Sequence, residues 1–432
     1  MFDGSGNAAF SGTLADYISA KGPDLLARWD AHQDWFDARM GRGVDPYCKV
    51  ALTRTGTLAQ SRLRCGRVVE GPNFASQDYL NLSSHPAIAE AARNAINEFG
   101  VHSAGSSALM GCTALSEELE RRLAAFLGYS DCTVFPTGWG AGYGIVKTLV
   151  RPDDHVVIDC LSHACLQEGA RNATRNVHAF PHLSNDAVAR RLTRIRDENP
   201  DAGILVVTET VFSMDSDVPN LRELQALCRR HGATLLVDVA HDLGAIGPTG
   251  RGYLELMNLV GQVDIVMGSF SKTFATNGGF VASNHRAMKL MLRGHCGPLL
   301  FSNAISPVQA AIALAALDIV QGEEGAELRG QLLASSVALR SAFKDAGFKV
   351  GGQPTAIVPI YLGDARTSRL MTREMHEAGI LVNLVEHPAV ARNACRWRAQ
   401  VMAKHDLEQV GRFVSAAAAA RDRISKEISC AT

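Results

Sequence analysis

From about residue 85 onward, short apolar runs alternate with longer amphipathic stretches. The runs are rich in β-branched residues and show no polar alternation, which predicts strands buried on both faces. The expected strands are 131–135, 155–159, 202–208, 235–239 and 263–268. The expected helices are 86–99, 115–127, 138–150 and 221–231, followed by an alanine- and leucine-rich region at 308–345. This alternation is typical of an α/β protein with a mostly parallel sheet sandwiched by helices.

The two ends of the chain follow different patterns. Residues 14–40 carry an interrupted helical stripe of large apolar side chains: Leu25, Leu26, Trp29, Trp35 and Phe36. Past residue 346, apolar runs at 349–350, 356–361 and 380–382 predict a smaller α+β domain at the C-terminus. We therefore expect an N-terminal arm and small-domain segment over 1–80, a large domain over 81–305 and a small domain over 306–432.

Composition and charge exclude several classes of partner. The 432 residues carry a net charge of -1, with 47% hydrophobic and 20% charged residues, as in ordinary globular proteins. Near-zero net charge gives no electrostatic reason to expect nucleic acid as a partner. No apolar window reaches the roughly 18 residues of a membrane span. The first six residues lack a basic segment followed by an apolar one, so no secretory signal is expected.

The ten cysteines are scattered through the chain. None shows the paired spacing with histidines that a zinc site requires, so no metal site is expected. Unpaired cysteines in apolar segments fit a reduced, cytoplasmic setting.

Two polar clusters close neighbouring apolar runs. Asp238 and His241 follow one run, whereas Ser269, Ser271 and Lys272 follow the next. A lysine amine can form a Schiff base with the aldehyde of pyridoxal 5'-phosphate (PLP), and an aspartate can keep the pyridinium nitrogen protonated so that the ring stays an electron sink. Alone, each has an ordinary reading, as a surface lysine or as a strand-end aspartate that caps an amide. Together they favour a PLP enzyme, because ligands bind at the carboxyl ends of such strands.

With these residues, the chain resembles the α-oxoamine synthase family of fold-type I PLP-dependent transferases. That family includes 8-amino-7-oxononanoate synthase, 2-amino-3-ketobutyrate CoA ligase, 5-aminolevulinate synthase and serine palmitoyltransferase. The likeness spans residues 74–405, and its motifs are 76–82, 137–139, 161–164, 209–215 and 241–252. Within the family, residues 138–182 most resemble the autoinducer synthases that make long-chain α-aminoketones.

The resemblance implies a role for each polar residue at the strand ends. Lys272 would hold PLP and remove the α-proton of the substrate, and Asp238 would pair with the pyridinium nitrogen. His163 would stack on the ring and position the thioester, while Ser213 and His241 would reach the phenolic oxygen. The implied phosphate contacts are Gly138 and Trp139 at a helix N-terminus, Ser269, Ser271, and Ser302 and Asn303 of a neighbouring subunit. The family therefore implies a homodimer with active sites at the subunit interface.

The implied substrate contacts are Arg396, Gln77 and Ser106. A guanidinium matches a carboxylate bidentately, but Arg398 would share a strand face with Arg396, so only the family position favours Arg396. A solvated basic cluster is the alternative. The family usually has an arginine near Ser107 and a histidine near Ser116, and their replacement puts acyl-CoA in doubt as donor and leaves an acyl carrier protein as an alternative. Val239 replaces a family acid.

The resemblance implies a decarboxylative Claisen condensation. Glycine, alanine or serine would react with an acyl thioester to give an α-aminoketone, CO2 and free thiol. Two alternatives stay open: a PLP aminotransferase or aldolase-type lyase of the same fold, and a cofactor-free partner subunit, which the presence of Lys272 disfavours.

Overall fold

The computed structural model describes residues 8–430, which form two compact units. The larger unit comprises residues 78–213 and 217–330. The smaller unit comprises the described residues up to 77, the segment 214–216 and the residues from 331 onward. Within 8–430, every helix is too short or too polar to span a membrane. The first seven residues, where the sequence predicted no secretory signal, lie outside the described residues.

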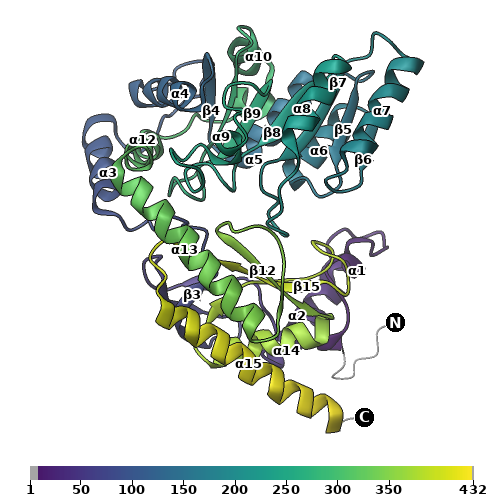
Figure 1. Cartoon of the computed structure of the whole chain (residues 1–432), viewed down its shortest axis with the longest axis vertical. Coiled ribbons are helices and arrows are strands. Elements are labelled where there is room, and N and C mark those ends of the chain that lie inside the picture. The colour runs from purple at the N-terminus through teal and green to yellow at the C-terminus, as the bar shows by residue number, and fades with distance from the viewer. Residues whose placement is uncertain (1–7, 431–432) are drawn as a thin grey trace. The chain divides into compact units, whose positions relative to one another are not determined.

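A seven-stranded sheet forms the centre of the larger unit (Figure 1). Its strands stand in the order β4-β10-β9-β8-β7-β5-β6. Their bounds are β4 Asp131–Phe135, β5 His155–Asp159, β6 Val177–Phe180, β7 Ile204–Glu209, β8 Thr234–Asp238, β9 Ile265–Ser269 and β10 Gly279–Ser283. β10 runs antiparallel to both of its neighbours, β4 and β9, and the other strand pairs of this sheet are parallel. The predicted mostly parallel sheet is confirmed, although β6 and β10 were not among the expected strands.

Helices connect these strands and cover the sheet. Their bounds are α3 Pro86–Phe99, α4 Ala114–Leu127, α5 Gly138–Leu149, α6 Ala164–Ala173, α7 Asn185–Glu198, α8 Leu221–Arg230, α9 Gly252–Leu256, α10 Met288–His295, α11 Gly297–Leu300, α12 Pro307–Gln321 and α13 Glu323–Asp345. Side-chain caps explain several starts. Thr113 accepts the Ser116 N–H before α4, and Ser306 accepts the Gln309 N–H before α12.

The core of the larger unit lies between α5, α6, α10 and the sheet. Ile145 of α5 and Leu166 of α6 pack with Val156, Leu236 and Met267 from three strands, all essentially inaccessible to water. Burying such side chains contributes about 25 cal/mol per Å² of apolar surface. All six residues of β7 are buried, which explains why its sequence shows no polar alternation.

The N-terminal helical stripe is shorter than the sequence predicted. The structure breaks residues 14–40 into α1 Ala15–Ile18, a 3-10 turn at Ala27–Trp29 and α2 Asp30–Gly41. Pro23 cannot donate a helical hydrogen bond, and Gly22 before it has a φ of 154°. Leu26 is consequently 81% exposed, whereas Trp35 of α2 is buried.

The smaller unit contains two four-stranded sheets. The first has the order β1-β2-β3-β13, and the second has the order β11-β12-β15-β14. Their bounds are β1 Val50–Ala51, β2 Leu58–Arg62, β3 Val68–Phe74, β11 Lys349–Val350, β12 Ile357–Gly363, β13 Leu381–Val382, β14 Leu384–Val385 and β15 Cys395–Gln400. Helices α14 Ala365–Glu377 and α15 Leu407–Cys430 complete the unit. Because β3 pairs in parallel with β13, segments from both ends of the chain share one sheet.

Candidate active site

The carboxyl ends of β7, β8 and β9 lie side by side at one edge of the seven-stranded sheet. β7 ends at Glu209 and β8 ends at Asp238, and these two residues are direct register partners. β9 ends at Ser269, and Lys272 follows in the next loop. The parallel arrangement therefore gathers two carboxylates, a hydroxyl and a lysine at the edge where such sheets bind ligands.

Glu209 and Asp238 form a buried pair of acids. Glu209 is 2% exposed and Asp238 is 7% exposed. Burial raises the pKa of Asp238, while the nearby positive charges of Lys272 and His163 oppose that rise. Burial and the charge of Asp238 raise the pKa of Glu209 well above its usual range. A cationic group held between these strand ends would offset their mutual repulsion.

His163 is attached to this pair through its backbone. Its N–H donates to Glu209 Oε1 over 2.6 Å. Its side chain caps α6, because Nδ1 accepts the Cys165 N–H over 3.3 Å. These contacts orient the imidazole at the first turn of α6.

The loop after β8 is braced from two sides. Tyr79 Oη and His241 Nδ1 lie 2.9 Å apart, and both side chains are buried. Asp242 accepts the Thr210 hydroxyl over 2.6 Å and the Tyr253 N–H over 2.7 Å. Burial raises the pKa of Asp242 to about 7. These contacts hold the loop that carries His241 in a fixed position after the end of β8.

Backbone amides and hydroxyls meet at the start of α5. Gly138 opens the helix, and a Cβ added to it would lie 2.5 Å from Ser269 Oγ. The Ser271 N–H donates to Ser269 Oγ over 3.3 Å. Thr137 caps the helix by accepting the Gly140 N–H over 2.9 Å. A helix N-terminus with two serine hydroxyls beside it is a suitable cradle for a phosphate.

Of the other predicted residues of the larger unit, Trp139 lies in the first turn of α5, and the rest lie in loops. Trp139 is half-exposed and stacks on Tyr143, with ring centroids 5.0 Å apart. Ser213 follows β7 and is partly buried. Ser302 donates to the Pro298 carbonyl, and Asn303 Nδ2 lies 3.0 Å from His102 Nε2. The Ser106 hydroxyl is buried and has no hydrogen-bond partner within residues 8–430.

Gln77 and Arg396 belong to the smaller unit. Arg396 lies on β15 and is buried, so it is not part of a solvated basic cluster. Its Nη1 donates to Asp215 and to the Met214 carbonyl, and its guanidinium lies 4.5 Å from the centre of the Tyr361 ring. Tyr361 Oη donates to Asp215 over 3.2 Å. The charge is therefore held in a fixed orientation.

The chain matches the family model of aminotransferase class I and II over residues 70–416. It is 36% identical to 8-amino-7-oxononanoate synthase of Geobacter metallireducens, over 82% of this chain and 90% of the relative. It is 32% identical to serine palmitoyltransferase of Bacteroides ovatus, over 90% of this chain and 95% of the relative.

The chain belongs to the α-oxoamine synthase family of PLP-dependent enzymes.

A solved structure supports the same placement within this family. Serine palmitoyltransferase of S. paucimobilis, which holds PLP and myriocin, has a TM-score of 0.86 and 30% identity. The match covers 93% of this chain and 99% of that one. The family assignment from the motifs is thereby confirmed, as are the fold-type I architecture and the assignment to PLP-dependent C-acyltransferases.

The residues present fit the cofactor of the α-oxoamine synthases. Ser269 can approach the first turn of α5 only because Gly138 has no Cβ, and this brings the serine hydroxyl to the helix N-terminus that would hold the phosphate. The buried Asp238 carboxylate can hold a protonated ring nitrogen. Lys272 is close enough to Asp238 to perturb its pKa, as a lysine that carries the cofactor aldehyde would be.

The structure adds several residues to those that the sequence predicted. Glu209 lay within a quoted motif, but only its register with Asp238 reveals the buried acid pair. Asp215 and Tyr361 orient Arg396 from segments far apart in the sequence. Asp242 and Tyr79 brace the loop of His241, and neither follows a pattern that periodicity detects.

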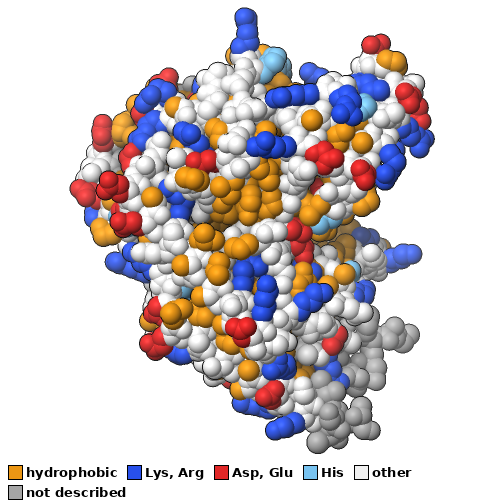
Figure 2. Space-filling model, in the orientation of Figure 1, with side chains coloured by type: hydrophobic (Ala, Val, Ile, Leu, Met, Phe, Trp, Pro, Cys, Tyr) orange, Lys and Arg blue, Asp and Glu red, His pale blue; other side chains and the backbone are white. Residues whose placement is uncertain are grey.

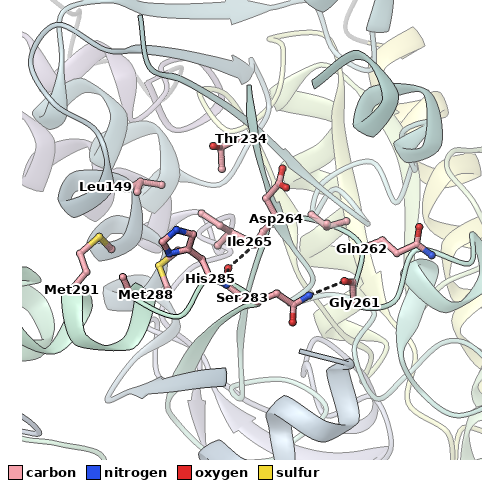
Figure 3. Close-up of a pocket in the computed structure, with 13 residues that line it drawn as sticks. Leu149, Thr234, Gly261, Gln262, Asp264, Ile265, Ser283, His285, Met288 and Met291 are labelled. Carbon is pink, nitrogen blue, oxygen red and sulfur yellow. Dashed lines mark hydrogen bonds between the residues drawn. The ribbon is translucent and has the colours of Figure 1, made fainter. Parts of the chain in front are cut away.

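A separate cavity lies at the ends where β8 and β9 begin, opposite the ends that carry the catalytic group (Figure 3). Its volume is about 640 Å³, and its lining includes Thr234 and Ile265, where β8 and β9 begin, together with Met288 and Met291 of α10. None of the predicted site residues lines this cavity. Residues 8–430 contain no group of three or more His, Cys, Asp or Glu side chains that could bind a metal ion.

Proposed function

We propose that this chain condenses a small amino acid, namely glycine, alanine or serine, with an acyl thioester. The acyl carbonyl carbon becomes bonded to the amino acid's α carbon, the C–S bond breaks to release a thiol, and the carboxylate leaves as CO2. The product is an α-aminoketone. The observation that carries this proposal is the group of Lys272, His163, Asp238 and Glu209 at one sheet edge of an α-oxoamine synthase.

Lys272 would hold PLP at rest and would be freed when the amino group of the substrate takes its place, and the cofactor would then supply an electron sink for the charge that develops at the α carbon. Asp238 would hold the proton on the ring nitrogen by a charge-assisted hydrogen bond. Lys272 would take the α-proton at Nζ, since a lysine amine is a competent base once desolvated. His163 would stack on the cofactor ring and position the thioester, and Ser213 and His241 would donate to the phenolic oxygen.

We assign the substrate carboxylate to Arg396, with Gln77 and Ser106 as flanking contacts. Asp215 and Tyr361 support this assignment, because they hold the guanidinium in one orientation before substrate arrives. Preorganising a charged group in this way reduces the entropy lost on binding. Arg398 is also buried on β15, so burial does not distinguish the two arginines. The choice of Arg396 therefore rests on its position in the family.

We propose a homodimer in which Ser302 and Asn303 reach the partner's cofactor phosphate. Large apolar side chains are exposed near these residues: Phe301 is 86% exposed, and Met110 is 90% exposed. The Ala304 N–H donates to the Gly105 carbonyl over 2.8 Å, which joins the two loops. Exposed apolar clusters of this kind mark protein interfaces.

The acyl donor is proposed to be an acyl carrier protein as well as, or instead of, acyl-CoA. Ser116 lies near the position of a family histidine and serves the capping box of α4, where its hydroxyl accepts the Thr113 N–H over 2.9 Å. Ser107 lies near the position of a family arginine, and its hydroxyl is buried. Neither residue supplies positive charge for CoA.

We propose the cytoplasm as the location, since nine cysteines among the described residues are free.

The test combines purified PLP-loaded protein with each amino acid and with matched acyl thioesters. Thiol release that requires both substrates, with equimolar CO2, is the expected result. Formation of a 2-oxoacid without thiol release would instead favour an aminotransferase. Full PLP occupancy with no thiol release from any pair would refute the condensation.

A further inference from the structure

A basic pocket lies beside β6, the edge strand at one side of the seven-stranded sheet. Its volume is about 310 Å³. One wall comes from β6 and the turn after it, and the other wall comes from α7. The lining residues are His178, Ala179, Phe180, Pro181, Ala187, Arg190, Arg191 and Arg194.

Most of the positive charge in this pocket is not neutralised. Within residues 8–430, no carboxylate oxygen lies within 4.0 Å of a side-chain nitrogen of Arg190 or Arg191, whereas Arg194 pairs with Glu198 over 2.7 Å. Burial and the charge of Arg191 lower the pKa of His178 to about 4, so this imidazole is neutral at pH 7. Figure 2 shows basic and acidic side chains side by side on the surface over α7. Unpaired guanidinium groups of this kind attract an acidic partner.

The lining of the pocket reaches, at Phe180 and Pro181, the carboxyl end of the strands, where the catalytic group also lies. Phe180 ends β6, as Asp238 ends β8, and both strands run in the same direction. Four strand spacings separate β9 from β6 in the sheet order. At about 4.8 Å per spacing, this separation is roughly 19 Å. An extended phosphopantetheine arm spans such a distance, so a carrier bound at α7 could present its thioester near Lys272.

The shape of the surface favours a protein over a small ligand. β6 is an edge strand, and Ala179 within it is exposed. Arg190 and Arg194 are one helical turn apart on α7, and both are exposed. Arg190 and Arg191, neighbouring cations on an open helix beside an edge strand, match carboxylates on an acidic helix.

We infer that the pocket between β6 and α7 is the docking surface for an acidic acyl carrier protein that delivers the thioester. This inference rests on the proposed condensation. The carrier contributes carboxylates to Arg190 and Arg191, and its pantetheine arm runs along the carboxyl edge of the sheet. The contact accelerates encounter by electrostatic steering, so it weakens as ionic strength rises.

The test compares one acyl chain delivered in two forms, as octanoyl acyl carrier protein and as octanoyl-CoA. The test variant is Arg190→Glu combined with Arg191→Glu. The matched control is Arg286→Glu, an exposed arginine outside this pocket. We expect the double variant to lose about 10- to 100-fold in kcat/KM with the carrier-borne thioester, mostly through KM, and to change less than about twofold with octanoyl-CoA. The control should retain wild-type values with both donors.

Equal losses with both donors would overturn the inference, because the pocket would then bind the phosphate that both donors share or support the fold. Unchanged turnover of the carrier-borne substrate would overturn it as well. Arg190→Gln with Arg191→Gln provides a milder variant if charge reversal lowers the melting temperature.

Direct binding of unacylated holo acyl carrier protein separates this inference from the proposed reaction. Carrier binding that depends on Arg190 and Arg191, in a chain that releases no thiol, would refute the condensation and support the docking surface. Thiol release from octanoyl-CoA without carrier binding would support the condensation and refute the docking surface.

Discussion

Gly138 and Ser269 are in direct contact, because a Cβ on Gly138 would lie 2.5 Å from Ser269 Oγ. Gly279 of β10 is also close to this helix start, because a Cβ added to Gly279 would lie 2.6 Å from the Cα of Gly138. The helix N-terminus, the end of β9 and the start of β10 are therefore packed backbone to backbone. This packing is what brings amide N–H groups and a serine hydroxyl to one point.

Replacing Gly138 by alanine is expected to weaken PLP binding. The new methyl group must displace Ser269 or the first turn of α5, and overpacking of this kind costs about 1–3 kcal/mol. We therefore expect roughly a tenfold rise in the dissociation constant of PLP, measured by spectroscopic titration of the apoprotein. Gly294→Ala is the control, because nothing lies within 4 Å of its added Cβ. An unchanged titration for the Gly138 variant would contradict the phosphate assignment.

Lys272→Ala is expected to abolish the visible absorbance of the PLP Schiff base and to slow condensation by at least about 10²–10⁴-fold. The melting temperature of the apoprotein should stay near the wild-type value, since Lys272 lies in a loop and is only partly buried. Lys147→Ala on α5 is a matched control. The measurement is borohydride trapping followed by peptide mapping. Trapping of the cofactor at a different lysine would refute the assignment.

Asp238→Asn is expected to leave PLP bound but to reduce turnover by about 100-fold or more, because an amide does not keep the ring nitrogen protonated. Glu209→Gln removes the register-paired acid and keeps an oxygen acceptor for the His163 N–H. We expect this second variant to lose less than about tenfold. Steady-state kinetics with saturating PLP measures both. Equal losses in the two variants would leave the pyridinium contact unassigned.

His182 lies between two carboxylates, with Nδ1 2.8 Å from Asp159 and Nε2 3.0 Å from Asp217. Burial alone would lower its pKa, but the hydrogen bonds to the two aspartates outweigh burial and raise the pKa to about 10. Because the folded pKa exceeds the unfolded value of 6.5, the stabilisation is complete below pH 6.5. It declines as the pH rises toward 10.

His182→Asn should therefore destabilise the protein by roughly 1–3 kcal/mol near neutral pH. The difference from wild type should shrink as the pH approaches 10. Melting temperatures of both proteins from pH 6 to pH 10 measure this effect. A difference that stays constant across this range would show that the positive charge of His182 does not contribute.

Asp215→Asn is expected to raise the KM for the amino acid about 5- to 10-fold, with kcat and the KM for the thioester changed less than about twofold. The asparagine no longer holds the charge of Arg396 in place, and binding energy is lost in ordering it. Tyr361→Phe is the milder comparison variant, since it keeps the ring beside the guanidinium and removes the hydroxyl bond to Asp215. A rise in the thioester KM instead would argue against Arg396 as the carboxylate ligand.

Local patterns in the sequence were sufficient for most elements of the larger unit. The helices expected at 86–99 and 115–127 begin within one residue of α3 and α4, because caps and apolar periodicity are properties of neighbouring residues. The same patterns predicted β7 and β8 as doubly buried strands. They did not predict β10, a short segment that follows Gly278 and becomes a strand only by pairing with β4 and β9 on either side.

The amino-acid sequence by itself determined the family, the cofactor and the strand ends at which Asp238 and Lys272 stand. Tertiary structure alone decided that Glu209 is the register partner of Asp238 and that Asp215 orients Arg396. It also decided that Gly138 contacts Ser269. The physical reason is that periodicity and capping depend on neighbours along the chain, whereas these contacts depend on strand order and register, which only the packed fold establishes.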